Sequence, residues 1–292
     1  MIRKYLSLVK FAHTIFALPF ALIGTMFGFQ VLTHTGQAPD KPYWQTIILV
    51  VLCMVFARSA AMAFNRYVDR DIDGKNERTK VREIPAGIIP AKSALAFVSL
   101  NSLLFIIITW FINPLCFFLS PVALLVVLGY SYTKRFTALC HLILGLGLAL
   151  APVGAFLAVT GKFQLAPIVL GFAVLFWVSG FDIIYALQDE EFDQENKLNS
   201  IPAWLGRERS LWVSTLLHML TAAMVILFGM LIGGGWLYAI GAVLFIGLLA
   251  YQHILVKPND LSRVNLAFFT TNGVASVVFA AFVIGEMLIS VL

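Results

Sequence analysis

The sequence predicts an all-α integral membrane protein with nine transmembrane helices. Of its 292 residues, 60% are hydrophobic and only 12% are charged, against roughly 45 to 50% and about 25% in soluble domains. The apolar residues form long runs, and the basic residues gather on alternate connections between those runs. These observations exclude a water-soluble globule and a disordered chain and favour the lipid bilayer as the surroundings.

Nine segments are long enough to cross a membrane, which takes about 20 predominantly apolar residues. Backbone polar groups find no water inside a bilayer, so runs of this length favour helices over strands. The first run follows a basic segment like that of a signal peptide, but it is too long and lacks a small-residue cleavage site, so we expect it to be retained. The predicted spans are residues 12–33, 45–65, 94–112, 115–131, 138–159, 166–187, 210–232, 236–255 and 265–285.

The Lys and Arg residues predict the orientation of these spans. Of the 20 basic residues, only Lys41 and Lys162 lie on one side of the membrane in this arrangement, and Arg58 lies within a span. All others lie at the amino terminus or in the loops after spans two, four, six and eight. Because positive residues mark cytoplasmic loops, we expect the amino terminus in the cytoplasm of a bacterial-type inner membrane. The net charge of +5 is thereby explained by basic residues that mark the cytoplasmic side, and no nucleic acid partner is expected.

The first acidic cluster follows the second span, in the segment FNRYVDRDID. Asn65, Asp69 and Asp73 are spaced i, i+4, i+8, so they share one face of a helix that continues from this span. Arg58 lies two turns earlier, near the same face. Asp71 falls off the stripe and is interpreted as a solvated loop residue.

The second acidic cluster follows the sixth span, in the segment IYALQDEEFDQENK. Asp189 and Asp193 repeat the i, i+4 spacing, with Lys197 one turn beyond and Tyr185 one turn before. Asp182 lies within the span, two turns before Asp189 and on its face, and an acid inside a membrane span is a functional candidate. The matching positions of the clusters indicate an internal duplication, with halves of about 1–136 and 137–292 in one transmembrane domain.

Closely spaced carboxylates at the end of a membrane helix repel one another unless a cation lies among them. Mg²⁺ binds one or two carboxylates and completes its shell with water and substrate phosphates. Two such stripes facing each other would hold a diphosphate between metal ions, and nearby Arg and Lys would neutralise the remaining oxygens. The sequence therefore predicts a Mg²⁺ and diphosphate site at the cytoplasmic face.

The two motifs resemble the signatures of the UbiA superfamily of intramembrane prenyltransferases. They read N-R-x-x-D-x-x-x-D from Asn65 and Y-A-x-x-D-x-x-x-D from Tyr185. The REIPAG segment from Arg82 is similar to the RPLPAG stretch of the family, and YSYTKR from Tyr130 is similar to its YxxxKR loop. The resemblance covers nearly the whole chain. It implies nine helices around a central cavity and the transfer of a polyprenyl group from its diphosphate to an aromatic acid in respiratory quinone biosynthesis.

The resemblance also implies roles for individual residues. Asn65, Asp69 and Asp73 would bind one Mg²⁺, and Asp189 and Asp193 the other. The candidates for diphosphate binding are Arg66, Lys75, Tyr130, Lys134 and Lys197. No Ser/His/Asp or Cys/His nucleophile is required, and no obligate protein partner is expected.

The aromatic acceptor is the part of the function that the resemblance leaves open. The 4-hydroxybenzoate branch usually carries a DKPIG-like stretch in its first span, whereas this chain reads VKFAHTIFALPFALIG, which is closer to a subgroup linked to dihydroxynaphthoate acceptors in menaquinone synthesis. Asp182 is a candidate for positioning the acceptor or taking its proton. The candidates for acceptor binding are Arg58, Lys10, His13 and Tyr185, although a structural hydrogen bond is the alternative for His13.

Two other classes of membrane protein compete with this interpretation. A secondary transporter would use intramembrane acids near Arg58 to bind a coupling ion, but its site would lie near the bilayer midplane, whereas both stripes lie at one surface. A phospholipid head-group transferase would need the signature D-x-x-D-G-x-x-A-R, of which the chain has only the Asp71-Ile72-Asp73-Gly74 stretch.

Overall fold

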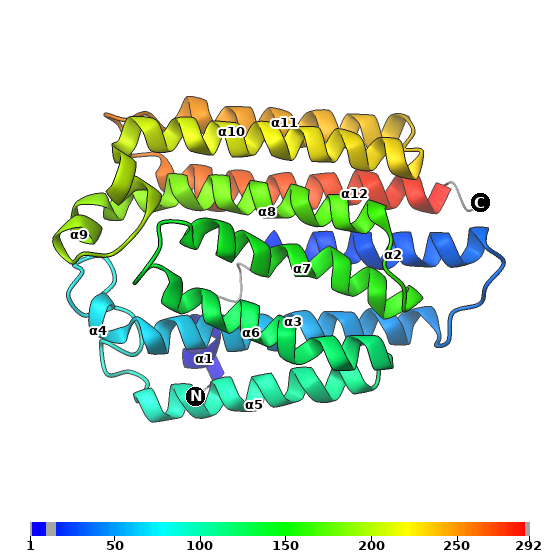
Figure 1. Ribbon diagram of the computed structural model, residues 1–292, viewed down its shortest axis with the longest axis horizontal. Helices are drawn as coiled ribbons and strands as arrows, with labels where there is room; N and C mark the ends of the chain where they lie inside the picture. The colour runs from blue at the N-terminus through cyan, green and yellow to red at the C-terminus, as the bar shows by residue number, and fades with distance from the viewer. Residues whose placement is uncertain (1, 10–15, 290–292) are drawn as a thin grey trace.

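The computed structural model describes residues 2–9 and 16–289 and confirms the all-α fold class (Figure 1). Within these residues the only β pairing is one isolated bridge between Lys257 and Asp260. The helices are α1 (Ile2–Leu8), α2 (Leu18–His34), α3 (Tyr43–Val68), α4 (Arg70–Asp73), α5 (Ala91–Trp110), α6 (Pro114–Thr133), α7 (Cys140–Thr160), α8 (Leu165–Ala186), the 3₁₀-helix η2 (Leu187–Asp189), α9 (Glu190–Glu195), α10 (Ile201–Ile232), α11 (Trp236–Leu255), the π-helix η3 (Leu266–Thr271) and α12 (Asn272–Ile289).

Eight helical segments in the described part of the chain are long and apolar enough to cross a membrane. They correspond to the second through ninth predicted spans, and they make the chain a multi-pass membrane protein. The first predicted span corresponds to α2, which is apolar but has only 17 residues. The count of nine spans and the cytoplasmic amino terminus therefore stay predictions.

The largest difference from the predicted boundaries is at α10, which begins at Ile201 rather than at residue 210. Ser200 caps this helix by accepting a hydrogen bond from the Ala203 N–H (3.2 Å), as short polar side chains do at helix starts. Gly206 then adopts φ 76°, ψ 171°, a conformation that favours glycine, and it kinks the helix. The charged residues after Gly206 resemble a loop, which is why the sequence pattern placed the start too late.

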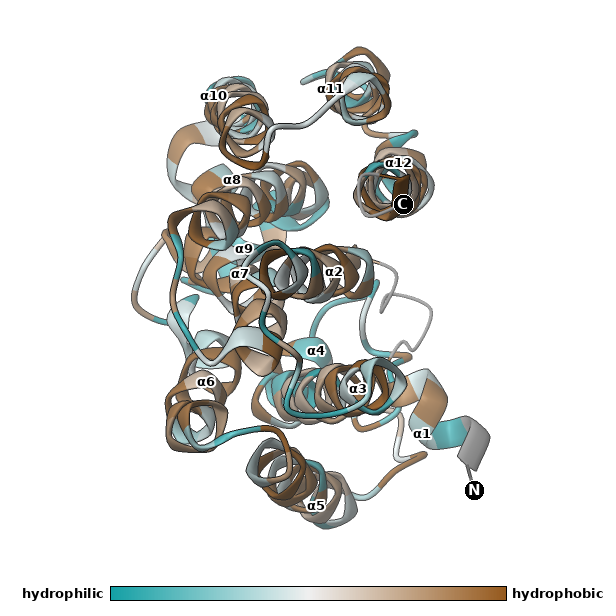
Figure 2. Cartoon of the chain, turned by 90° about the vertical axis from the view of Figure 1, so that its right-hand side faces the viewer, coloured by the Kyte–Doolittle hydropathy of each residue, from teal (hydrophilic) through white to brown (hydrophobic). Residues whose placement is uncertain are grey.

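The helices form two groups joined by a central pair (Figures 1 and 2). Helices α8, α10, α11 and α12 lie together on one side, and α3, α5 and α6 lie on the other. Helices α2 and α7 pack against each other between the groups, and α7 also packs on α8 and α6. Both acidic clusters lie at the same end of the bundle, where α4 and α9 are found (Figure 1).

The core of the larger group is aromatic. Trp177 is fully buried and its ring packs against Phe20, Phe181 and Phe245, with centroid distances of 5.1 to 5.6 Å. Close packing of α2 on α7 depends on Gly24, because a Cβ atom there would lie 2.2 Å from the Pro152 carbonyl oxygen. This core packs around α8, and the second acidic motif follows α8 on η2 and α9.

Candidate active site

The first acidic motif lies at the break between α3 and α4. The Asp69 N–H donates to the Asn65 carbonyl (2.9 Å) and the Asp73 N–H to the Asp69 carbonyl (2.7 Å), so the predicted spacing survives the break. The Asn65 side chain donates to Asp69 Oδ2 (3.1 Å). Asp69 and Asp73 are each only 3% exposed. All three side chains line one polar cavity.

The second acidic motif has the same local geometry. Asp189 (φ −107°, ψ 6°) precedes α9 as Asp69 (φ −88°, ψ 2°) precedes α4, and both lie in the sparsely populated bridge region that is common at active sites. Each short helix then carries a buried second aspartate, Asp73 or Asp193. Asp189 and Asp193 line the same polar cavity as the first motif, so both stripes contribute to one site.

Basic side chains surround the carboxylates of the first motif. Arg135 Nη2 lies 3.0 Å from Asp69 Oδ1, and Lys134 Nζ lies 3.5 Å from Asp69 Oδ2. Arg82 donates to Asp73 Oδ1 at 2.6 Å. Arg135 also donates to the Val68 carbonyl (2.9 Å) at the end of α3, where a cation offsets the negative end of the helix dipole. The buried negative charge is thus compensated by several cations.

Arg78 links the loop that follows the first motif to the second motif. Its guanidinium forms a two-pronged ion pair with Asp189, and it donates to the Tyr185 hydroxyl at 3.0 Å. Asn76 adds a hydrogen bond to Asp189 Oδ1 (3.0 Å). Burial would lower the pKa of Arg78, but the hydrogen bond and charge of Asp189 outweigh it and raise that pKa. Arg78 therefore stays charged at the edge of the cavity.

Substitution of Arg78 with leucine should lower kcat/KM for a polyprenyl diphosphate by about tenfold, because a charge-assisted contact is lost on the side of the second motif. Steady-state kinetics of prenyl transfer would measure this change. The matched control is Lys80→Leu in the same loop, since Lys80 is exposed and pairs only with Glu77. Equal kinetics for both variants would contradict a role for Arg78 in donor binding.

The donor set of the cavity fits a hard divalent cation. Asp69 Oδ1 and Asp73 Oδ2 are buried, and no described residue donates a well-aligned hydrogen bond to either oxygen. Arg135 Nη2 lies 3.0 Å from Asp69 Oδ1, and Arg66 Nη1 lies 4.0 Å from Asp73 Oδ2. Unsatisfied buried carboxylate oxygens are costly unless a metal ion or donor meets them. In the described part of the chain no three acidic, His or Cys side chains converge on one point. Water and phosphate oxygens would therefore complete the shell, as is usual for Mg²⁺.

Asp182 is held in this cavity by a histidine. Its Oδ2 lies 2.7 Å from Nδ1 of His141, and Nε2 of His141 lies 3.3 Å from the Ile201 nitrogen. Because the Ile201 N–H must donate to Nε2, Nδ1 carries the proton that His141 donates to Asp182. His141 is 3% exposed, whereas the Asp182 side chain is 22% exposed. Asp182 is thereby oriented with part of its carboxylate open to the cavity.

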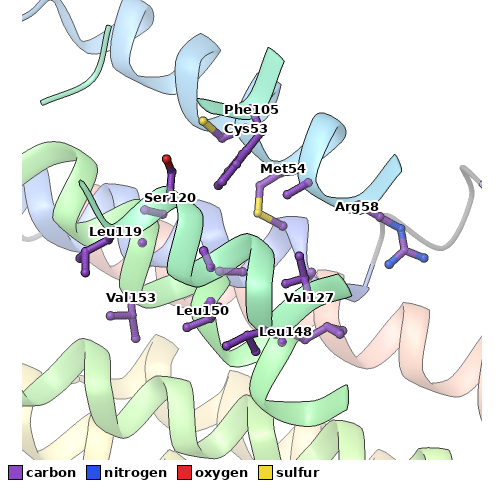
Figure 3. Close-up of a pocket in the computed structure, with 18 of the residues that line it drawn as sticks. Cys53, Met54, Arg58, Phe105, Leu119, Ser120, Val127, Leu148, Leu150 and Val153 are labelled. Atoms are coloured by element: carbon purple, nitrogen blue, oxygen red, sulfur yellow. The ribbon is translucent and has the colours of Figure 1, made fainter. Parts of the chain in front are cut away.

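The polar cavity, of about 290 Å³, adjoins an apolar cavity of about 360 Å³. The apolar cavity lies among α3, α5, α6 and α7, and Arg58 lies at its polar end (Figure 3). Arg58 Nε is buried, and no described residue forms a hydrogen bond with it. The residues that line both cavities are Arg58, Met62, Tyr130, Leu144 and Leu148. The polar cavity and the apolar cavity therefore share one wall.

Most of the residues predicted from the sequence lie together. Lys75 and Lys197 are exposed and do not line the polar cavity, and Lys10 and His13 lie outside the described residues. The predicted residues that line this cavity are Asn65, Asp69, Asp73, Asp189, Asp193, Asp182, Arg66, Tyr130, Lys134, Arg58 and Tyr185.

Sequence reasoning missed several other residues of the cavity. The REIPAG match pointed to Arg82, but no motif singled out Arg78 or Asn76. His141 resembled a packing residue because it lies among apolar neighbours, and its role depends on a contact with Asp182, 41 positions away. The cavity residues without an assigned role from the sequence include Asn76, Arg78, Arg82, His141 and Phe268.

Comparisons with known proteins identify the family. A family model described as the UbiA prenyltransferase family matches residues 11–274. The 4-hydroxybenzoate octaprenyltransferase of Nitrosospira multiformis is 32% identical over 247 residues, which is 85% of this chain and 85% of that protein. The corresponding enzyme of Saccharophagus degradans is 32% identical over 252 residues, which is 86% of this chain and 84% of that protein.

Solved structures show the same fold. The apo structure of a UbiA homologue from Aeropyrum pernix K1 has a TM-score of 0.79 and 27% sequence identity, covering 96% of this chain and 98% of that one. A UbiA homologue from Archaeoglobus fulgidus bound to DMAPP and Mg²⁺ has a TM-score of 0.73 at 23% identity, covering 98% and 99%. The chain belongs to the UbiA prenyltransferase family.

Proposed function

We propose that this chain transfers a polyprenyl group from its diphosphate to an aromatic acid of the 4-hydroxybenzoate type, with Mg²⁺ as the metal ion. The observation that carries this proposal is the shared wall between the polar and apolar cavities. A polyprenyl diphosphate has the same division, with an anionic head and a long apolar tail. The 4-hydroxybenzoate octaprenyltransferases among the relatives and the homologue bound to DMAPP and Mg²⁺ support these substrate classes.

The diphosphate head would be bound between the two acidic motifs. Asn65, Asp69 and Asp73 on one side, and Asp189 and Asp193 on the other, are the oxygen donors that would hold Mg²⁺. When bound, the metal ion neutralises the diphosphate and weakens its bond to the allylic carbon.

The basic residues of the cavity would act on the same leaving group. Arg78, Arg82 and Lys134 line the cavity and would stabilise the negative charge that grows on the diphosphate as the carbon–oxygen bond breaks. Arg66, Lys75 and Lys197 remain further candidates for diphosphate binding. Lys75 and Lys197 would have to move, because both are exposed and neither lines the cavity.

The aromatic acid would bind near the junction of the cavities. Arg58 and Tyr185 are proposed to orient it, with the Arg58 guanidinium facing the acceptor carboxylate. An aromatic ring carbon then forms a bond to the allylic carbon, diphosphate departs, and the ring loses the proton at that carbon. Asp182, which His141 holds in the cavity, is the proposed acceptor of this proton. Lys10 and His13 stay candidates for acceptor binding.

Substitution of Asp182 with asparagine should lower kcat by about 100-fold, because an amide cannot accept the ring proton. The KM for the polyprenyl diphosphate should change little, since the diphosphate contacts are elsewhere in the cavity. Glu286→Gln is the control, because Glu286 accepts a hydrogen bond from the Tyr238 N–H (3.1 Å) at the other end of the bundle. An unchanged kcat in Asp182→Asn would refute the proposed base.

The decisive experiment offers two acceptors to the purified chain in the presence of Mg²⁺ and a long-chain polyprenyl diphosphate. We expect prenylated 4-hydroxybenzoate. Prenylation of a dihydroxynaphthoate alone would assign the same chemistry to menaquinone biosynthesis, which the first-span sequence favours. Formation of neither product would overturn the proposal.

The site is proposed to face the cytoplasm of a bacterial-type inner membrane. Both acidic clusters lie at the end of the bundle that carries the basic loops, and positive residues are retained on the cytoplasmic side. Labelling of an engineered cysteine at exposed Asp71 in intact and in permeabilised cells would test this orientation. Labelling of the intact cells would contradict it.

A further inference from the structure

A π-helix, η3 (Leu266–Thr271), comes directly before α12. Such a turn contains one residue more than an α-helical turn and is frequent at functional sites. Ala267 is buried in a cluster with Ile184 and Leu255. Its neighbour on the π-helix, Phe268, is half-buried and packs against the large aromatic core.

Phe268 also lines the polar cavity. Its ring stacks on Tyr185 with a centroid distance of 4.1 Å, and it meets Phe181 and Phe16 edge-on at 5.3 and 5.7 Å. These four rings, which we call the aromatic wall, all line the same cavity. Tyr185 also receives the hydrogen bond from Arg78, so the wall adjoins the diphosphate end of the site.

A polar network inside the bundle holds the π-helix in place. The Asn272 amide donates to the carbonyls of Ala267 (3.2 Å) and Phe268 (3.0 Å). Its Oδ1 accepts hydrogen bonds from Trp177 Nε1 (2.9 Å) and Gln252 Nε2 (2.6 Å). Trp177, Gln252 and Asn272 are all fully buried, and buried polar groups left without partners are costly. The π-helix is therefore tied to α8 and α11 through one amide.

We propose that Asn272 is a positioning residue for prenyl transfer, acting by keeping Phe268 in the aromatic wall. The inference rests on the proposed function. As the diphosphate leaves, the allylic carbon becomes electrophilic, and water would attack it to give a prenyl alcohol in place of the prenylated acid. The face of an aromatic ring attracts positive charge, and an apolar wall excludes water. Phe268 thus directs the allylic carbon toward the aromatic acceptor.

The test measures the ratio of prenyl alcohol to prenylated acid formed from one donor. Phe268→Leu and Asn272→Leu should each raise this ratio by about tenfold. The double variant should give the same ratio as Phe268→Leu alone, because two residues that act through one contact are not additive. A purely structural role of Asn272 would reduce the yield of folded protein and leave the ratio unchanged.

The control is Asn101→Leu, which removes another buried intramembrane asparagine whose amide donates to the Phe97 carbonyl of its own helix (2.7 Å). Its product ratio should match that of the wild type.

If Asn272→Leu fails to fold, Gln252→Leu removes one hydrogen bond to Asn272, and Phe268→Leu still tests the aromatic wall. An unchanged ratio in Phe268→Leu, or independent effects in the double variant, would overturn the inference. Absence of prenylated acid from the wild-type chain would instead overturn the proposed function.

Discussion

Replacement of Asp69 with alanine should lower the rate of prenyl transfer by at least about 10³-fold, because it removes a proposed metal ligand beside the developing charge. Asp69 is buried, and no described residue donates a well-aligned hydrogen bond to its Oδ1 although two cations lie close by. Its loss would remove an oxygen donor and leave Lys134 and Arg135 without their anion. The measurement is single-turnover formation of the prenylated acid at saturating Mg²⁺.

Asp71 provides the matched control for this substitution. It lies two positions away, its side chain is 82% exposed, and it forms an ion pair with Arg70 at the surface. Asp71→Ala should retain the wild-type rate, because exposed ion pairs contribute little. If Asp69→Ala kept its rate as well, the two acidic motifs would not form the metal site and the proposed mechanism would be wrong.

Removal of divalent metal with EDTA should reduce prenyl transfer to below about 1% of its rate, and added Mg²⁺ should restore it. Without the ion, only the basic side chains of the cavity would remain to stabilise the charge that develops on the diphosphate. We expect the fold to survive, because the carboxylates of Asp69, Asp73 and Asp189 each have a basic partner in the structure. Activity assays and thermal unfolding of the same EDTA-treated sample would separate the two effects.

Two results would contradict this prediction in different ways. Full activity after chelation would exclude a role for the metal ion in the reaction. Loss of the folded state would show that the basic partners do not compensate the buried carboxylates, and the metal ion would then have a structural role. Recovery with Mg²⁺ but not with Na⁺ at equal ionic strength would rule out simple charge screening.

The fold class and the acidic motifs could be predicted because they follow from local sequence. A membrane span is a long apolar run, and the i, i+4 spacing of Asp69 and Asp73 places them on one face wherever the chain is helical. The spacing survives even where α3 ends, since the Asp73 N–H still donates to the Asp69 carbonyl. The start of α10 was less predictable. The helix is kinked at Gly206, and this kink depends on the backbone conformation of that one residue.

The remaining parts of the site depend on contacts between distant segments. Arg78 is one of several basic residues in its loop, and only the tertiary fold brings it to Asp189, 111 positions away. The π-helix before α12 leaves no pattern in the apolar periodicity, because Ala267 and Phe268 are both hydrophobic and either could face the core. Its position is decided by hydrogen bonds to Asn272 from two other helices.

The ion pair between Arg78 and Asp189 has a thermodynamic consequence for substrate entry. The Arg78 guanidinium cannot pair fully with the Asp189 carboxylate and with phosphate oxygens at the same time. Binding of the diphosphate together with its metal ion would therefore exchange one set of ion pairs for another. Arg78 would then pair with the diphosphate, and Asp189 with the metal ion. If the diphosphate binds at Arg78 as proposed, each charge would have a partner of opposite sign before and after the exchange, and no isolated charge would be left at the edge of the cavity.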